Sequence, residues 1–220
     1  MFMKKEYIKL ALSFQVSQDA SDKAIFISKK FGSKYKSKFI LDGKNFYPHI
    51  TIYPADYPAK NLQYILDGIE NVSTRFKPVK MIFSKIEYHG GYIMVYFEQT
   101  PEIQELHKRI VETLDGFRDN YINDKYSDLE YLDVKGFNNL EKENIKKYGY
   151  PYVMDCYYHP HLSLIKLEDV EDVKTIIDSI DWDIESFDIN KLVLHKIAEN
   201  GAAVEIIKKF NLDKHGPIKF

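Results

Sequence analysis

Two short motifs combine the residue types that can move protons around a phosphate group. The first is His49-Ile-Thr51-Ile and the second is His161-Leu-Ser163-Leu. Each motif places an imidazole two residues before a hydroxyl, with apolar residues between and after them. Because alternate residues of a β-strand point to the same face, each motif predicts a strand that carries both polar groups on one side.

The four polar groups suit phosphodiester chemistry if the two strands face each other across a cleft. A neutral histidine can take a proton from the attacking oxygen, and a protonated histidine can give one to the leaving oxygen. The hydroxyls of Thr51 and Ser163 can donate hydrogen bonds to the non-bridging phosphate oxygens, where negative charge grows in the transition state. This scheme requires no metal and no other cofactor.

The motifs belong to a longer internal repeat. They lie 112 residues apart, and the segment Lys80–Gly90 aligns with Lys191–Gly201 at an offset of 111. We therefore predict a single bilobal domain over residues 1–220, of α+β (α/β-type) class. Its lobes are expected to contain the repeats 46–99 and 158–210, related by a pseudo-twofold axis with the cleft between them.

Hydrophobic periodicity predicts alternating strands and helices around the motifs. Strands are expected at 7–15, 46–53, 79–87, 92–98, 157–167, 187–197 and 203–210. Helices are expected at 21–38, after Pro58, after Thr100-Pro101 and at 168–180. Residues 119–155 break this rhythm, because they are polar, rich in tyrosine and weakly periodic. We interpret them as an insertion between the lobes that forms a lid or side wall over one end of the cleft.

The composition indicates a globular protein and restricts its partners. Hydrophobic residues make up 45% of the 220 residues, and the net charge of −2 argues against a basic surface for long double-stranded nucleic acid. The single cysteine, Cys156, excludes an intramolecular disulfide and favours a reducing compartment, so a cytoplasmic location is expected. No apolar run approaches the roughly 18 residues of a membrane span, so no membrane partner is expected. We expect a monomer.

The histidine spacing also permits a metal-dependent alternative. His159 and His161 share one face of their expected strand, a spacing that can bind zinc. With Asp155 nearby, a hydrolase built on His49, His159 and His161 is conceivable. Such a neighbouring histidine more often orients or shields another side chain, so the leading hypothesis assigns no metal.

Other polar and aromatic residues are assigned supporting roles. Tyr47 and Tyr53 flank the first motif on the side expected to face the cleft, where either can stack on a base or pack at the rim. Ser84 and His195 occupy equivalent places in the repeat and are interpreted as structural. The remaining histidines, which we expect to be solvated, are His89, His107 and His215.

Paired histidine–hydroxyl motifs in two similar lobes resemble those of the two-histidine (2H) phosphoesterase superfamily, which includes 2′-5′ RNA ligase-like proteins and cyclic phosphodiesterases. The resemblance covers residues 5–118 and 156–210. It implies that His49 and His161 correspond to the catalytic histidines of the superfamily. Thr51 and Ser163 then correspond to its phosphate-binding hydroxyls.

The resemblance also implies a class of reaction. The superfamily acts on 2′,3′-cyclic phosphate ends, 2′-5′ linkages and small cyclic oligonucleotides, and it trims RNA. A phosphoric diester hydrolase is therefore expected, acting on a small nucleotide or an RNA end, with reversible 2′-5′ ligation as a related activity. Residues 119–155 exceed the usual connection and leave the substrate open. A non-catalytic nucleotide- or RNA-binding module of the same fold is the alternative.

Overall fold

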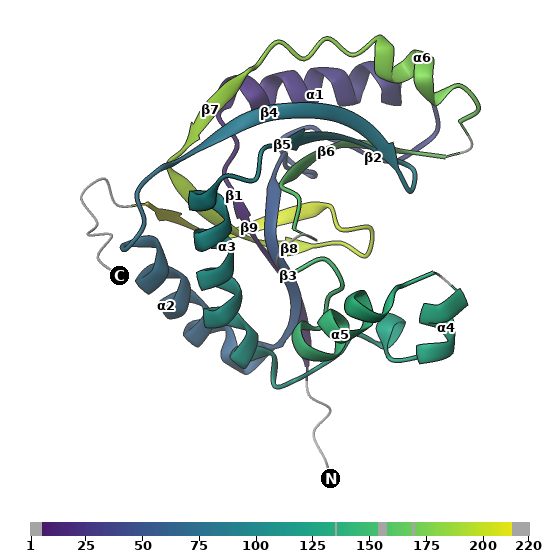
Figure 1. The fold of residues 1–220 in the computed structure, drawn as a ribbon. Helices are drawn as coiled ribbons and strands as arrows, with labels where there is room; N and C mark the ends of the chain where they lie inside the picture. Colours follow the sequence, from purple (N-terminus) through teal and green to yellow (C-terminus); the bar gives the residue numbers. More distant parts are fainter. Residues whose placement is uncertain (1–5, 135, 154–157, 169, 213–220) are drawn as a thin grey trace.

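The computed structural model describes residues 6–134, 136–153, 158–168 and 170–212 (Figure 1). Asp155, Cys156 and His215 lie outside the described residues. Within the described ranges the strands are β1 (Tyr7–Phe14), β2 (Ser37–Ile40), β3 (Ile50–Pro58), β4 (Val79–His89), β5 (Tyr92–Phe97), β6 (His161–Leu167), β7 (Ser186–Ile189), β8 (Lys191–Ile197) and β9 (Ala203–Asn211). The α-helices are α1 (Gln18–Gly32), α2 (Leu62–Ser73), α3 (Pro101–Leu114), α4 (Leu129–Val134), α5 (Asn139–Tyr148) and α6 (Val173–Asp178). Three short 3₁₀ helices are η1 (Ala59–Asn61), η2 (Asp115–Arg118) and η3 (Asp124–Tyr126).

The described strands form one antiparallel sheet whose two motif strands are central neighbours. The strand order is β7-β4-β5-β6-β3-β1-β8-β9, with β2 paired to β6. The central strands β3 and β6 are joined by a single residue pair, Ile50 with Leu162. In contrast, β1 follows β3 along its whole length. The sheet therefore consists of two halves that touch at one point and separate beyond it.

The two sequence repeats do not occupy fully equivalent places in this sheet. An axis between β3 and β6 exchanges β4 with β8, in agreement with the aligned segments Lys80–Gly90 and Lys191–Gly201. The same axis exchanges β5 with β1 and β9 with β7, so β5 and β9 do not correspond in position. The predicted superposition of residues 46–99 on 158–210 is therefore limited to the motif strands and to β4 and β8, and for these elements it stays a prediction.

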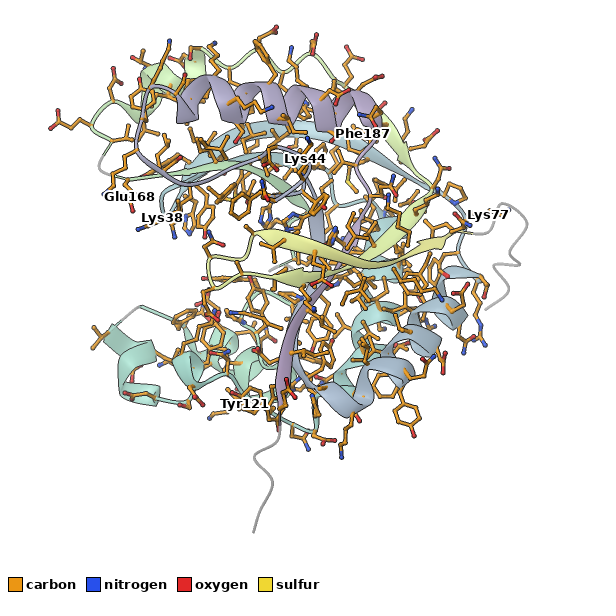
Figure 2. All side chains as sticks on the ribbon, turned by 180° about the vertical axis from the view of Figure 1, so that it is seen from behind. Lys38, Lys44, Lys77, Tyr121, Glu168 and Phe187 are labelled. Atoms are coloured by element: carbon orange, nitrogen blue, oxygen red, sulfur yellow. The ribbon has the colours of Figure 1, made fainter. Side chains whose placement is uncertain are left out.

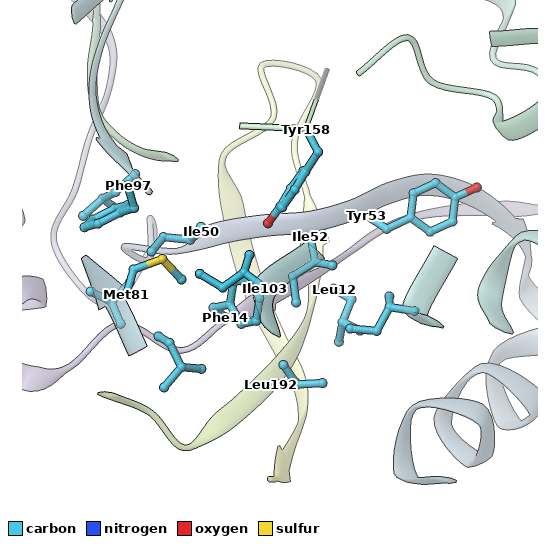
Figure 3. Close-up of a cluster of buried hydrophobic side chains, with 14 of the residues drawn as sticks. Leu12, Phe14, Ile50, Ile52, Tyr53, Met81, Phe97, Ile103, Tyr158 and Leu192 are labelled. Carbon is cyan, nitrogen blue, oxygen red and sulfur yellow. The ribbon is translucent and has the colours of Figure 1, made fainter. Parts of the chain in front are cut away.

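Helices cover the outer faces of the two halves. Helix α1 packs against β2 and β6, whereas α2 and α3 pack against each other and against β9 and β3 (Figure 1). Leu12, Phe14, Ile50 and Ile52 are at most 2% exposed and lie in the hydrophobic cluster of Figure 3. The apolar residues of the first motif therefore anchor its strand in the core, where each buried side chain contributes about 1.5–3 kcal/mol.

Local signals explain where several elements begin. The Thr100 hydroxyl accepts a hydrogen bond from the Ile103 amide (3.4 Å), which confirms the predicted start of α3. Helix α1 begins before the predicted residue 21, because the Ser17 hydroxyl caps it by accepting from the Ala20 amide (3.3 Å). Strand β3 extends beyond the predicted end at residue 53 and passes through Pro54, which is tolerated where one strand edge has no partner.

Residues 119–155 contain more regular structure than their weak periodicity predicts. Helix α5 begins with a capping box in which Asn138 and Glu141 bond each other's backbone amides. It ends at Gly149, whose φ of 72° lies in the left-handed region. At the start of the insertion the Tyr121 ring stacks on Tyr7 with centroids 3.9 Å apart, at the N-terminal end of β1 (Figure 2).

On the opposite half, Lys38 of β2 forms an ion pair with Glu168 (Figure 2).

A buried arginine joins both ends of the insertion to the domain. Arg118 is 1% exposed, and its guanidinium donates to the Asp115 carboxylate (Nε–Oδ1, 2.9 Å) and to the carbonyls of Tyr121 and Lys147 (Nη2–O of Lys147, 2.8 Å). A Cβ atom on Gly149 would lie 2.6 Å from the Arg118 Nη1 atom. Glycine is thus required there by both the positive φ and the close approach of the guanidinium. No helix among the described residues is long and apolar enough to cross a membrane.

Replacing Arg118 with leucine should strongly destabilise the protein. The variant removes the cation that balances the partly buried Asp115 charge and leaves two carbonyl groups without their donor, and the loss of one partner of a buried pair costs about 3–5 kcal/mol. Urea unfolding at neutral pH measures this change. Arg109→Gln is the control, because Arg109 is a half-exposed helix residue and its loss should cost at most about 0.5 kcal/mol. Equal stability of the two variants would contradict the assigned role.

Candidate active site

The single pair between β3 and β6 brings the four polar groups of the motifs together. In an antiparallel pair, residues on either side of a matched position also face each other. The Ile50–Leu162 pair therefore sets His49 opposite Ser163 and Thr51 opposite His161. All four side chains are half-buried and line one cavity, on the face opposite Ile50 and Leu162.

A β-bulge follows the hydroxyl residue in each motif. On β3, Thr51 pairs with Ser13 and Tyr53 pairs with Leu12, so Ile52 is the extra residue. On β6, Ser163 pairs with Met94 and Ile165 pairs with Ile93, so Leu164 is the extra residue. Bulges bend a strand and re-aim its side chains, and they are common beside active sites. Here both strands bend directly after their histidine–hydroxyl pair.

The bulge overturns the expectation that Tyr53 faces the cleft. Since Ile52 adds one residue, the alternation of faces is reversed beyond it, and Tyr53 is fully buried on the helical side. Its hydroxyl lies 2.8 Å from the Tyr148 carbonyl and 3.1 Å from the Asp115 carboxylate. Figure 3 shows its ring directed away from Tyr158. Tyr47 does line the cavity, as predicted.

The cavity between the two halves has a volume of about 550 Å³, within the range of small-molecule sites. Its walls carry residues from both motifs, from the β4–β5 and β8–β9 turns and from the insertion. The insertion contributes Asn123, Lys125, Tyr126, Tyr150 and Tyr152. The described part of the insertion therefore forms a wall at one end of the cleft.

Both histidines are held by equivalent backbone hydrogen bonds. The Nδ1 atom of His49 lies 2.9 Å from the Tyr47 carbonyl, and that of His161 lies 2.8 Å from the His159 carbonyl. A carbonyl only accepts, so Nδ1–H donates in each case. In the neutral imidazole this leaves the lone pair on Nε2, on the other side of the ring. Each histidine is thus oriented to accept or deliver a proton through Nε2.

The surroundings of the two histidines favour their neutral forms. Burial is the main cause that lowers the pKa of His49, and the charge of His161, which lines the same cavity, lowers it further. Burial also lowers the pKa of His161, with a smaller contribution from His159. In contrast, the backbone hydrogen bond that each ring makes raises its pKa. Among the described residues, no carboxylate is a cause of the shift at either histidine.

Two other histidines are buried beside the site. His195 is 3% exposed, and its ring centroid lies 5.6 Å from that of His49. Burial and the charge of His49 lower the pKa of His195 to about 3. The expectation that His107 is solvated is wrong, because it is 3% exposed and stacks on Tyr158 (3.7 Å), and burial lowers its pKa to about 4. Its position on the inner face of α3 at helical spacing with Ile103 is the sequence signal for this burial.

Further neighbours of the motifs are not identified from the sequence. Tyr96 on β5 pairs with His161, with ring centroids 5.6 Å apart. The Tyr158 hydroxyl donates to the Thr51 carbonyl (3.2 Å) and so connects the two motif segments. His89 is exposed, as predicted. Ser84 is also exposed on its strand, whereas its repeat equivalent His195 is buried.

The metal-dependent alternative finds no ligand set in the part of the chain that the structure describes. Within those residues no group of three or more histidine, cysteine, aspartate or glutamate side chains is arranged to hold a metal ion. His159, the third ligand of that alternative, is exposed next to His161. Asp155, its fourth member, lies outside the described residues.

Comparison with known proteins supports the fold. A family model described as "Protein of unknown function (DUF1045)" matches residues 58–202, a range that includes the second motif and starts after the first. The curated proteins include no match to this chain. The protein TT0787 of Thermus thermophilus has a TM-score of 0.59 at 10% identity and covers 94% of this chain and 100% of its own.

Escherichia coli LigT is similar over the same extent. Its apo form has a TM-score of 0.56 at 10% identity, covering 94% of this chain and 99% of its own. Its complex with 3′-AMP has a TM-score of 0.56 at 11% identity, covering 94% and 98%. The chain therefore has the LigT-like fold of the 2H phosphoesterases, which confirms the predicted fold class.

Acid should destabilise the protein through its buried histidines, and His195→Leu should reduce this effect. Below pH 6.5 an unfolded histidine binds a proton, but folded His195 stays neutral until about pH 3. The unfolded state then binds more protons, so the free energy of unfolding falls as pH falls, by about 1.4 kcal/mol per pH unit for one such group. Urea unfolding between pH 4 and 6 should show a slope smaller by about this amount in the variant.

A surface histidine provides the control for this measurement. His89 is exposed, so His89→Gln should leave the pH dependence of stability unchanged. At neutral pH, His195→Leu should cost little, because the buried Nδ1 atom of His195 makes no hydrogen bond in the described structure. Parallel stability curves for wild type and His195→Leu would disprove the buried neutral state.

Proposed function

The chain belongs to the DUF1045 family, and we propose that it is a metal-independent phosphodiesterase acting on an RNA end or a small cyclic nucleotide. The observation that carries this proposal is the Ile50–Leu162 pair, which sets each histidine opposite the hydroxyl of the other motif. Two proton-transfer groups and two hydrogen-bond donors then face one cavity. This arrangement is what in-line displacement at a phosphodiester requires.

The reaction follows from the orientation of the two imidazoles. For a 2′,3′-cyclic phosphate, Nε2 of the neutral histidine takes a proton from water while the water oxygen forms a bond to phosphorus. The bond from phosphorus to one ribose oxygen breaks, and Nε2–H of the protonated histidine delivers its proton to that oxygen. The product is a phosphomonoester, and the two histidines have exchanged protonation states.

The hydroxyls of Thr51 and Ser163 stabilise the charge that develops in this step. Each lies across from a histidine and can donate to a non-bridging oxygen of the phosphate. Their positions are held by strand pairing, since Thr51 pairs with Ser13 and Ser163 pairs with Met94. Donors that are already in place need little reorganisation as the transition state forms.

We assign His49 as the base and His161 as the acid for hydrolysis. His49 is enclosed by Tyr47, His161 and His195, all of which are uncharged or cationic. His161 lies nearer to solvent, next to the exposed His159. The enclosed ring loses its proton more readily, and the ring nearer to water retains one more easily.

Alanine substitution of either histidine should remove most of the activity. His49→Ala and His161→Ala should each lower kcat/KM for 2′,3′-cyclic mononucleotides by roughly 10²–10⁴-fold, the usual contribution of a positioned proton-transfer group. The double variant should lose less than the product of the single losses, because both groups act in one step. Thr51→Ala and Ser163→Ala should lose about 10- to 10³-fold. Steady-state kinetics measures all five variants.

His159→Ala is the matched control and also tests the metal-dependent alternative. His161 bonds the backbone carbonyl of residue 159, which alanine retains. If the reaction is acid–base catalysis without a metal, kcat/KM should fall by less than about threefold. Activity should also survive a chelator. The metal-dependent mechanism would be established instead by two results together. A chelator would abolish activity that zinc or manganese restores, and the His159→Ala variant would be inactive. Binding of nucleotides without any turnover would identify a binding module.

The pH profile of kcat/KM should be bell-shaped with its maximum below pH 6.5. Burial lowers the pKa of both His49 and His161, so the form with one proton is most populated on the acid side of the ordinary histidine pKa. A phosphodiester keeps its single charge through this range, so the profile reports the protein. The kcat profile should move to higher pH, because the bound anion favours a protonated imidazole. A kcat/KM maximum above pH 7.5 would contradict this arrangement.

A further inference from the structure

The cavity continues well beyond the four groups of the motifs. Asp56 lies five residues after Thr51 on β3, a separation of about 16 Å at the usual rise of a strand, and both residues line the cavity. Lys9 pairs with Asp56 on the neighbouring strand and faces the same side. The wall around this far end is supplied by the insertion. We call Asn123, Lys125, Tyr126, Tyr150 and Tyr152 the distal site.

One cation of this region lacks a carboxylate partner. Lys9 forms an ion pair with Glu199 (3.0 Å), and the Asp56 carboxylate accepts from the Asn123 amide (2.9 Å). In the part of the chain that the structure describes, Lys125 forms no ion pair within 4.0 Å, and its ammonium lies 4.5 Å from the Tyr126 ring centroid. Lys125 is exposed while it lines the cavity; desolvation by the neighbouring wall and the charge of Lys9 lower its pKa, while Asp56 and Glu199 act against this. An anion placed next to Lys125 would therefore be favourable.

Aromatic rings stand next to this lysine. Tyr150 packs edge-to-face against Tyr126 (6.4 Å) and Tyr152 (5.8 Å), which holds the three rings in fixed positions. Tyr152 is nevertheless 42% exposed while lining the cavity. A rigid, solvent-exposed ring in a cleft is a surface on which a nucleobase can stack, and every base has such a π-face.

We propose that the distal site binds a second nucleotide, with Lys125 on its phosphate and Tyr152 on its base. This inference rests on the proposed phosphodiesterase function of His49 and His161, and it names the substrate class. The preferred substrate is then a single strand of two or more nucleotides with its reacting phosphate at the histidines. A free cyclic mononucleotide fills only the motif end of the cavity.

Two probes that differ by one nucleotide test this proposal. They are adenosine 2′,3′-cyclic phosphate and adenylyl-(3′→5′)-adenosine 2′,3′-cyclic phosphate. Wild type should prefer the dinucleotide by roughly tenfold or more in kcat/KM. Tyr152→Ala should reduce this ratio about 5- to 100-fold, as expected for the loss of one stacked base. Lys125→Gln should reduce the ratio and also weaken its dependence on salt concentration.

Matched controls come from the same segment and from helix α2. Lys146 on α5 and Tyr64 on α2 are exposed and do not line the cavity, so Lys146→Gln and Tyr64→Ala should keep the wild-type ratio. A wild-type ratio near one, or a ratio that Lys125→Gln and Tyr152→Ala leave unchanged, would overturn the distal site. Circular dichroism checks that all variants are folded.

Equilibrium binding separates failure of the distal site from failure of catalysis. The His49→Ala/His161→Ala double variant should bind both probes without converting them. The dinucleotide should bind at least tenfold more tightly, and adding Lys125→Gln or Tyr152→Ala should remove this difference. If wild type converts neither probe, the phosphodiesterase function is wrong, and the binding ratio still decides for or against the distal site.

Discussion

The site depends on one contact, the pairing of Ile50 with Leu162. Each of these residues is the apolar position between a histidine and a hydroxyl residue, so pairing them necessarily opposes each imidazole to the hydroxyl of the other motif. Both side chains are fully buried, which fixes this register by hydrophobic burial rather than by the polar groups. Because the strands separate beyond this contact, the same pair that assembles the polar groups also leaves the cavity open next to them.

The bulges connect this contact to the rest of the fold. The extra residue Ile52 reverses the face of the following residue, so Tyr53 turns toward the helices and bonds Asp115 and the Tyr148 carbonyl. Asp115 also accepts from Arg118, which holds both ends of the insertion. The first motif and the wall of the distal site are therefore parts of one hydrogen-bonded unit. The position of the wall relative to Thr51 is fixed by buried groups.

The sequence predicts the parts of this arrangement that follow from local patterns. The motif strands, both hairpins and the Thr100 cap of α3 follow from alternation and capping residues, and they are present in the structure. The bulge at Ile52 is invisible in the sequence because no residue type requires it, so the predicted direction of Tyr53 is wrong. Helix α5 is not predicted although Asn138, Glu141 and Gly149 mark its ends, since its apolar periodicity is weak. Strand β5 lies beside β6, whereas the corresponding place beside β3 is taken by β1, a strand that lies outside the sequence repeat. The sheet position of β5 therefore does not follow from the repeat.

The charges around the histidines indicate how substrate binding and proton placement are coupled. Burial lowers the pKa of both His49 and His161, and in the described ranges no carboxylate is among the groups that act on either ring. The free cleft thus favours two neutral imidazoles, although the proposed reaction requires one imidazolium. A bound phosphodiester supplies the missing negative charge and raises the pKa of the nearer ring. In the proposed reaction, proton uptake is therefore linked to binding of the anion, and the acid is charged when a phosphate is there to receive its hydrogen bond.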